Sequence, residues 1–132
     1  MTVVFLTLDE AIALHADQIE RYGGRPGLRD LGLLQSALGV PSATFDGRFL
    51  HDGLHEMGAA YLFHVVRDHP FVDGNKRVGL VILLAFLGLN SRWLDAVPED
   101  VERLVQGIAS GRVSKAEAAV FVQQHLRPRS RK

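Results

Sequence analysis

The stretch HPFVDGNKR (His69–Arg77), followed directly by the apolar run Val78–Leu89, decides how this chain folds. A proline pushes the residue before it out of the right-handed helical region, so a helix that reaches His69 ends there. The Gly-Asn pair inside the stretch suits a tight turn. The apolar run is well short of the roughly 20 residues that a membrane span needs. The stretch therefore predicts a helix, a short loop and a second helix buried in the core.

Helix-capping patterns extend this layout in both directions. A capping box, Thr-Leu-Asp-Glu at 7–10, opens a helix that ends near Tyr22, and a second box, Ser-Lys-Ala-Glu at 114–117, opens the last helix. Asp30 can cap a short helix, and Pro98 suits the first turn of another. No alternation typical of strands appears. The sequence predicts an all-α domain of six helices, over about 8–22, 30–38, 52–68, 73–89, 98–109 and 115–126.

Some details within this layout can also be predicted. Residues 41–49 are expected to form an exposed loop or short hairpin, which is a candidate flap for docking a target segment. Trp93 is expected in the core, and His64 in the core or at its rim. The apolar spacing of the first helix turns one set of side chains inward, namely Leu8, Ile12, Leu14 (or Ala11) and Ile19.

Composition narrows the classes of function. The 132 residues fit one domain over 1–132, and 15 basic residues balance 15 acidic ones, so no net field attracts nucleic acid or an anionic membrane. Cysteine is absent, which excludes disulfides and thiolate metal sites and fits a reducing cytoplasm. Asp9 and Glu10 interrupt any signal-peptide-like stretch. We expect a cytoplasmic protein without membrane or direct nucleic-acid binding, with a solvated basic tail at about 127–132.

The start of the second helix of the motif has the composition of a phosphate site. A helix start leaves amides without partners and carries roughly half a positive charge. Gly74 allows a positive φ and Asn75 tolerates one, so successive amides can point at one anion. Lys76 and Arg77 add formal charge, which opposes the helix dipole unless an anion lies between them. The pattern predicts a phosphate cradle of the helix N-terminal kind.

The remaining motif residues complete a group-transfer site. Asp73 among phosphate oxygens is reasonable if Mg²⁺ bridges the carboxylate and the phosphates. His69, a short loop away, is of the residue type that most often removes a hydroxyl proton. Phe71 is apolar between polar neighbours and is expected to anchor the loop in the core. Together these residues indicate phosphate chemistry on a hydroxyl acceptor.

HPFVDGNKR resembles the signature of the Fic/Doc superfamily, and specifically of its Doc (death-on-curing) toxin branch. A second stretch, RYGGRPG (Arg21–Gly27), resembles a segment common in Doc-like chains, and the resemblance covers nearly the whole chain. It implies the Fic fold, a compact bundle of about six helices. By resemblance, His69 acts on the target hydroxyl and Asp73 holds Mg²⁺. The same resemblance assigns phosphate or nucleotide contacts to Asn75, Arg77 and Arg67.

Departures from the AMP-transferring pattern refine the expected reaction. Lys76 replaces the second glycine of the Gly-Asn-Gly-Arg signature, and Leu80 stands where a later arginine would be. Doc-like members with this lysine transfer phosphate rather than AMP. The resemblance thus implies a kinase-type toxin that uses ATP and Mg²⁺ on a translation factor, elongation factor Tu, and arrests translation. An AMP-transferring Fic enzyme is the runner-up.

Regulation and two rival readings also follow from the sequence. None of its glutamates has a serine or threonine four positions earlier, so the self-inhibitory [Ser/Thr]-x-x-x-Glu pattern is missing and inhibition by a separate antitoxin is expected. One rival is a non-catalytic toxin-fold binding module. The other is a metal phosphohydrolase of the His-Asp type, whose candidate ligands are His15, His51, Asp52 and Asp68 or Asp95. His51 and His55, four residues apart, are otherwise expected at the surface.

Overall fold

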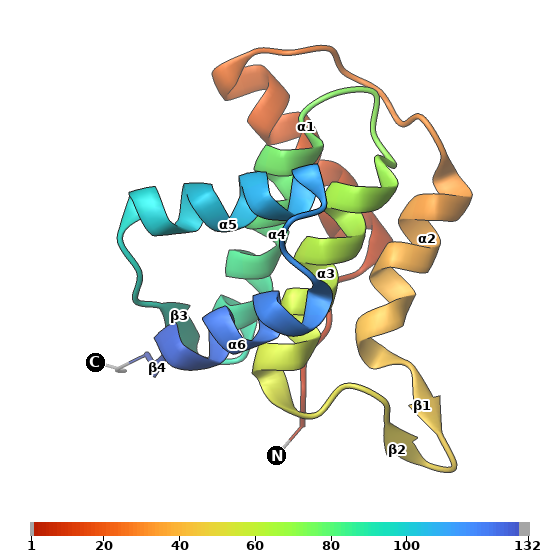
Figure 1. Ribbon diagram of the computed structural model, residues 1–132. Helices are drawn as coiled ribbons and strands as arrows, with labels where there is room; N and C mark the ends of the chain where they lie inside the picture. Colours follow the sequence, from red (N-terminus) through yellow and green to blue (C-terminus); the bar gives the residue numbers. More distant parts are fainter. Residues whose placement is uncertain (1, 130–132) are drawn as a thin grey trace.

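The computed structural model describes residues 2–129, and Figure 1 shows their arrangement. Over this range the chain forms six α-helices, one 3-10 turn and two short strand pairs, so the predicted all-α bundle is confirmed. The helices are α1 Leu8–Tyr22, α2 Leu31–Gly39, α3 Gly53–Asp68, α4 Asn75–Leu89, α5 Pro98–Ser110 and α6 Lys115–His125. The other elements are η1 Val40–Ser42, β1 Thr44–Phe45, β2 Arg48–Phe49, β3 Arg92–Leu94 and β4 Leu126–Pro128.

The antiparallel pair α3 and α4 forms the centre of the bundle, and α1, α2, α5 and α6 surround it (Figure 1). Two glycines allow the central helices to lie close together. A Cβ atom on Gly58 would be 2.7 Å from Leu83 Cδ1, and one on Gly79 would be 2.9 Å from Val66 Cγ2. Both distances are too short for carbon atoms in contact. The relative position of α3 and α4, whose facing ends carry the motif, therefore depends on these glycines.

Local capping signals predicted the helix ends well. The Thr7 and Ser114 side chains each accept from the backbone amide three residues on, in complete capping boxes, and Asp30 accepts from the Leu33 amide. The inward face of α1 was predicted less well. Ile12 is 38% exposed, whereas Ala11 and His15 are buried. The buried face is set by what α1 packs against, namely α4, α2 and, through His15, the motif loop.

Two further expectations need correction. Trp93 is 47% exposed rather than in the core, because β3 lies at the surface and pairs with β4. The hairpin β1–β2 forms as expected within 41–49. However, it precedes α3 and lies at the far end of that helix from the motif loop, which is the green loop at the top of Figure 1. A helix of 16 residues separates them by about 24 Å, so this hairpin cannot be a flap over the motif.

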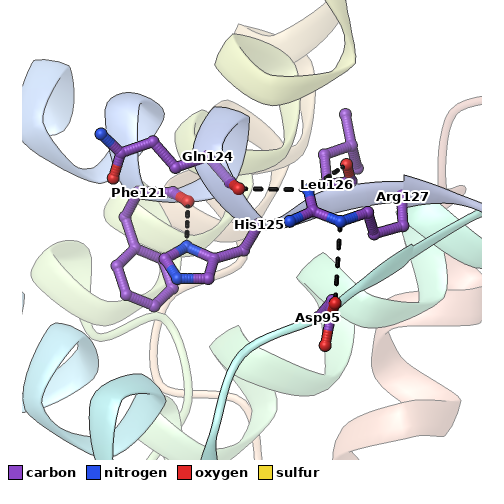
Figure 2. A network of polar contacts seen from close by, with 6 residues as sticks. All are labelled: Asp95, Phe121, Gln124, His125, Leu126 and Arg127. Atoms are coloured by element: carbon purple, nitrogen blue, oxygen red, sulfur yellow. Dashed lines mark hydrogen bonds and ion pairs between the residues drawn. The ribbon is translucent and has the colours of Figure 1, made fainter.

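Residues 127 and 128 are more ordered than the solvated tail predicted for them. Arg127 and Pro128 belong to β4, which pairs antiparallel with β3. Figure 2 shows polar contacts beside this strand pair. The Asp95 carboxylate lies 3.6 Å from Arg127 Nε, and His125 Nδ1 donates to the Phe121 carbonyl oxygen at 2.7 Å. Residues 130–132 of the predicted tail lie outside the described residues. Across residues 2–129, every helix is too short or too polar to span a bilayer.

Candidate functional site

The motif loop begins where α3 ends. His69 has φ 50 and ψ 56, in the left-handed region, so the helix ends there as the following proline predicted. The last carbonyl groups of a helix lack intrahelical partners. Arg29 supplies them, because its Nε donates to the His69 carbonyl oxygen at 2.6 Å and its Nη2 to that of Asp68 at 2.8 Å. Arg29 therefore fixes the backbone from which the motif imidazole projects.

The segment between α1 and α2 runs beside the motif loop and is hydrogen-bonded to it. The Val72 amide donates to the Gly27 carbonyl oxygen at 3.0 Å, and the amides of Arg29 and Asp30 both donate to that of Pro70. The RYGGRPG stretch (Arg21–Gly27) thus lies against the motif. The resemblance pointed to each of the two stretches separately, because no local pattern predicts a contact over this separation.

The interior of the loop is braced by Phe71, as expected. Its side chain is 1% exposed and stacks on the His15 ring, with 3.8 Å between ring centroids and 6° between planes. Asn75 grips the Phe71 backbone from both sides: Oδ1 accepts from the Phe71 amide and Nδ2 donates to its carbonyl oxygen, both at 3.0 Å. The Asn75 side chain is thus occupied by the loop, which leaves its backbone amide for a phosphate.

We expect Asn75→Ala to destabilise the protein by roughly 1–3 kcal/mol, because it leaves the buried amide and carbonyl of Phe71 without partners. Urea denaturation followed by circular dichroism measures this loss. The exposed Gln123→Ala is the matched control and should leave the unfolding midpoint in place. An unchanged midpoint in the Asn75 variant would show that the brace contributes nothing to stability.

Asp73 is held as a carboxylate at the edge of the loop. Its Oδ2 accepts from the Arg25 amide at 3.0 Å and its Oδ1 from the Gly74 amide at 2.9 Å. These backbone hydrogen bonds, with a smaller contribution from the charges of Arg25 and Arg77, lower the pKa of the Asp73 carboxyl. Its own carbonyl oxygen lies 2.7 Å from His15 Nε2. His15, buried and stacked on Phe71, therefore links the anchor to the backbone of Asp73.

The metal ligands that the protein offers at Asp73 fit magnesium better than a metal that needs several protein ligands. Within residues 2–129 there is no group of three or more His, Cys, Asp or Glu side chains that could hold a metal ion. Each carboxylate oxygen of Asp73 accepts one hydrogen bond and keeps further lone pairs. Mg²⁺ is typically bound through one or two carboxylates, with water and substrate phosphates completing its octahedron. Asp73 alone can hold such an ion if a phosphate substrate is present.

The start of α4 presents positive groups without acceptors. Gly74, with φ 78, precedes the helix and no side chain caps it. Among the described residues, the amides of Asn75, Lys76 and Arg77 have no hydrogen-bond acceptor, as expected for a first turn. Arg77 Nη2 donates to the Gly23 carbonyl oxygen at 2.8 Å, while its buried Nε has no partner in that same range. Unpartnered donors converging at a helix start form an anion site.

These groups surround one hollow of about 540 Å³. It is lined by Tyr22, Gly23, Gly24, His69, Val72, Asp73, Gly74, Asn75, Lys76 and Arg77. The structure therefore brings together the predicted imidazole, the predicted carboxylate and the predicted cradle. A neighbouring hollow of about 560 Å³ also contacts Lys76 and Arg77, but its other walls are mainly apolar and come from α4, β3 and α5.

Arg67, the other predicted nucleotide contact, does not line this hollow. Its Nη1 donates to the Ile108 carbonyl oxygen at 3.3 Å, near the end of α5. The guanidinium thus satisfies a carbonyl group near the C-terminus of α5. The nucleotide contact assigned to Arg67 by resemblance stays a prediction.

The metal phosphohydrolase reading lacks its ligand set. His15, one candidate ligand, is stacked on Phe71 and bonded to the Asp73 backbone. His51 and His55 are half-buried and line a separate hollow with Lys115. No three of the candidate ligands come together at any place in the part of the chain that the structure describes. His64 is a rim residue, as expected, and contacts Lys115.

Comparison with known proteins agrees with this geometry. The Fic/DOC family matches residues 5–87, a range that contains the whole motif. The chain is 38% identical over 111 residues to "Protein kinase doc" of Escherichia phage P1, which covers 84% of this chain and 86% of that protein. It is also 38% identical over 96 residues to "Toxin Doc" of Mycolicibacterium smegmatis, covering 73% of this chain and 72% of the relative.

Proposed function

The chain belongs to the Fic/DOC family, and from that premise we propose that it is a Doc-type toxin that transfers a phosphate from ATP to a hydroxyl side chain of a protein. The names of its two relatives, a protein kinase and a toxin, support this reading. The observation that carries it is the hollow in which His69 and Asp73 face the open start of α4. A scaffold that only bound a partner would have no use for that arrangement of charges.

Each residue of the hollow has a proposed part in the transfer. His69, whose side chain has no hydrogen bond to any of residues 2–129, is available to orient the acceptor hydroxyl and take its proton. The amides of residues 75–77 and the side chains of Lys76 and Arg77 would bind the phosphate oxygens. Asp73 would hold Mg²⁺, which, when bound, offsets negative charge on the phosphates.

The neighbouring apolar hollow is a suitable place for the nucleoside. It meets the phosphate hollow at Lys76 and Arg77, so one nucleotide could extend across both. Leu80, Leu84 and Val101 are among its apolar walls. Gln106, whose Oε1 lies 3.5 Å from Lys76 Nζ, and Glu102 add polar groups at its edge. A few polar groups in a mainly apolar hollow are typical of small-molecule sites.

Lys76 separates phosphate transfer from AMP transfer in this proposal. A glycine at this position would leave space beside the α4 start, whereas the lysine fills it and supplies a donor. We expect Lys76→Gly to shift the group added to the target from a phosphate toward an AMP. Intact-mass spectrometry of the target distinguishes the two adducts. If the wild-type adduct is already AMP-sized, the lysine argument is wrong and the chain is an AMP-transferring enzyme.

The proposed target, by resemblance, is elongation factor Tu, and the proposed effect is arrest of translation. Incubating that factor with ATP, Mg²⁺ and this protein should increase its mass by one phosphate. If other proteins of a translation extract gain a phosphate but this factor does not, the proposed reaction stands and the proposed target is wrong. An extract in which nothing is modified would instead favour the non-catalytic binding module.

Control of the toxin is proposed to come from a second chain. The self-inhibitory pattern is missing from these 132 residues, so nothing within them supplies a glutamate of that kind to the phosphate hollow. A cognate antitoxin with an amphipathic segment could occupy a groove of this domain. Co-expression of a short neighbouring reading frame should then restore growth.

A further inference from the structure

A second cluster of titratable side chains lies between α3 and α6 and shares no residue with the hollows around the motif. It surrounds a hollow of about 540 Å³. The α3 side contributes polar groups from His51, His55 and Glu56. The α6 side contributes Lys115 and an apolar wall, made by Ala116, Ala119 and Val120, with Gln123 beside it. None of the proposed toxin chemistry uses this hollow.

Lys115 is connected through His64 to a carboxylate. Its Nζ lies 3.1 Å from His64 Nε2, and His64 Nδ1 lies 3.7 Å from Asp68 Oδ2. A protonated lysine can only donate, so His64 accepts at Nε2 and carries its own proton on Nδ1, toward Asp68. Carboxylate, imidazole and amine follow the order of a catalytic triad, with an amine in place of the usual hydroxyl and a 3.7 Å ion-pair contact between His64 and Asp68 in place of a hydrogen bond.

The surroundings favour the uncharged forms that such chemistry needs. Burial lowers the pKa of the Lys115 amine, although Glu56 acts in the opposite direction. Burial and the nearby Lys115 charge lower the pKa of the His64 imidazole, against the effect of Asp68. A lysine becomes a nucleophile when its amine is free, and a histidine accepts a proton when it is neutral.

We propose that Lys115 is a nucleophilic lysine that accepts an acyl group from a small acyl phosphate entering this hollow. The Nζ lone pair forms a bond to the acyl carbonyl carbon, and the carbon–oxygen bond to phosphate breaks. The phosphate leaves with that electron pair, and the proton lost by Nζ passes to His64 Nε2. The apolar wall of α6 accommodates the acyl chain, while His51 and His55 offer ring N–H groups to phosphate oxygens. The product is an uncharged N-acyl lysine.

The sequence provides an internal reference, because the exposed Lys76 is a second described lysine; it is a demanding reference, since its own hollow is proposed to bind phosphate. The full-length protein should be incubated with acetyl phosphate and digested with chymotrypsin. Peptide mass spectrometry then gives the acetylation rate at each lysine. We expect Lys115 to be acetylated several-fold faster than Lys76. Equal rates, or a faster rate at Lys76, would overturn the proposal.

Variants separate nucleophilic activation from simple exposure. His64→Gln keeps an acceptor for Lys115 but removes the base, and should slow acetylation at Lys115 by about tenfold or more, since a positioned base contributes 10²–10⁴. Gln123→Ala is the matched control: Gln123 lines the same hollow, has no hydrogen bond to Lys115 and takes no part in the proposed transfer, so this variant should leave most of the rate. Far-UV circular dichroism checks that both variants fold. An unchanged Lys115 rate in folded His64→Gln would refute the role of the imidazole.

Discussion

Replacing His69 with asparagine is expected to lower phosphate transfer by roughly 10²–10⁴, the range lost when a positioned general base is removed. The imidazole lines the phosphate hollow, and its side chain has no hydrogen bond to the described residues that a substitution would break. Asparagine tolerates the left-handed backbone at this position nearly as well as histidine does. Arg29 contacts His69 only through its backbone carbonyl oxygen, which the variant keeps. Activity should therefore fall while stability stays close to wild type.

Initial rates of phosphate incorporation into the target, with unfolding midpoints measured beside them, test this expectation. His55→Asn is a suitable control, because His55 lines the separate hollow on α3 and α6. It should retain full transfer and growth arrest. Near wild-type transfer by His69→Asn would show that the imidazole takes no part in the mechanism. Loss of the fold in this variant would instead show that His69, like Asn75, stabilises the loop.

Asp73→Asn should be almost as damaging, with a loss of roughly 10²–10³, the size typical of removing one preorganised electrostatic group. An asparagine oxygen can still accept from the Arg25 amide, so the change removes the negative charge offered to Mg²⁺ together with the hydrogen bond from the Gly74 amide. More Mg²⁺ should then be needed for half-maximal rate. Asp46→Asn, in the distant hairpin turn, controls for the loss of one surface carboxylate. An unaltered magnesium requirement would contradict metal binding by Asp73.

Acid titration gives an independent check on the same carboxylate. Because the folded pKa of this carboxyl is lowered below its ordinary value of 3.8, its contribution to stability is present above that value and is lost as pH falls through the lowered folded pKa. Asp73→Asn should remove this dependence at the acid end of a stability curve. The carboxylate also stays charged through the mildly acidic range, so it cannot account for activity lost there.

Helix ends and the motif loop could be predicted from the sequence because their causes are local. Thr7, Asp30 and Ser114 act on amides three residues away, and Pro70 acts on the residue before it. The matched family and relatives also confirm the Fic/Doc resemblance that the motif indicated. A short stretch of sequence can therefore predict a structural feature whose cause lies within that stretch.

The supporting contacts of the site could not be predicted, because they join residues far apart in the chain. His15 reaches the Asp73 backbone across 58 positions, and Arg29 reaches His69 across 40. The same limit explains the error at Ile12, since apolar spacing cannot show that a histidine on α1 is needed against Phe71. The sequence likewise could not show that the Arg67 guanidinium donates to the Ile108 carbonyl oxygen, 41 positions away.

The glycine contacts between α3 and α4 link the catalytic geometry to a place remote from it. Gly58 contacts Leu83 toward one end of the helix pair and Gly79 contacts Val66 toward the other, so α3 and α4 lie close together along their length. His69 follows the end of α3 and Asn75 begins α4. A single methyl group added at Gly58 would push the two helices apart and shift His69, the proposed base, relative to the proposed phosphate site at the start of α4. Loss of toxicity in a spontaneous mutant can thus arise from a residue that never meets a substrate.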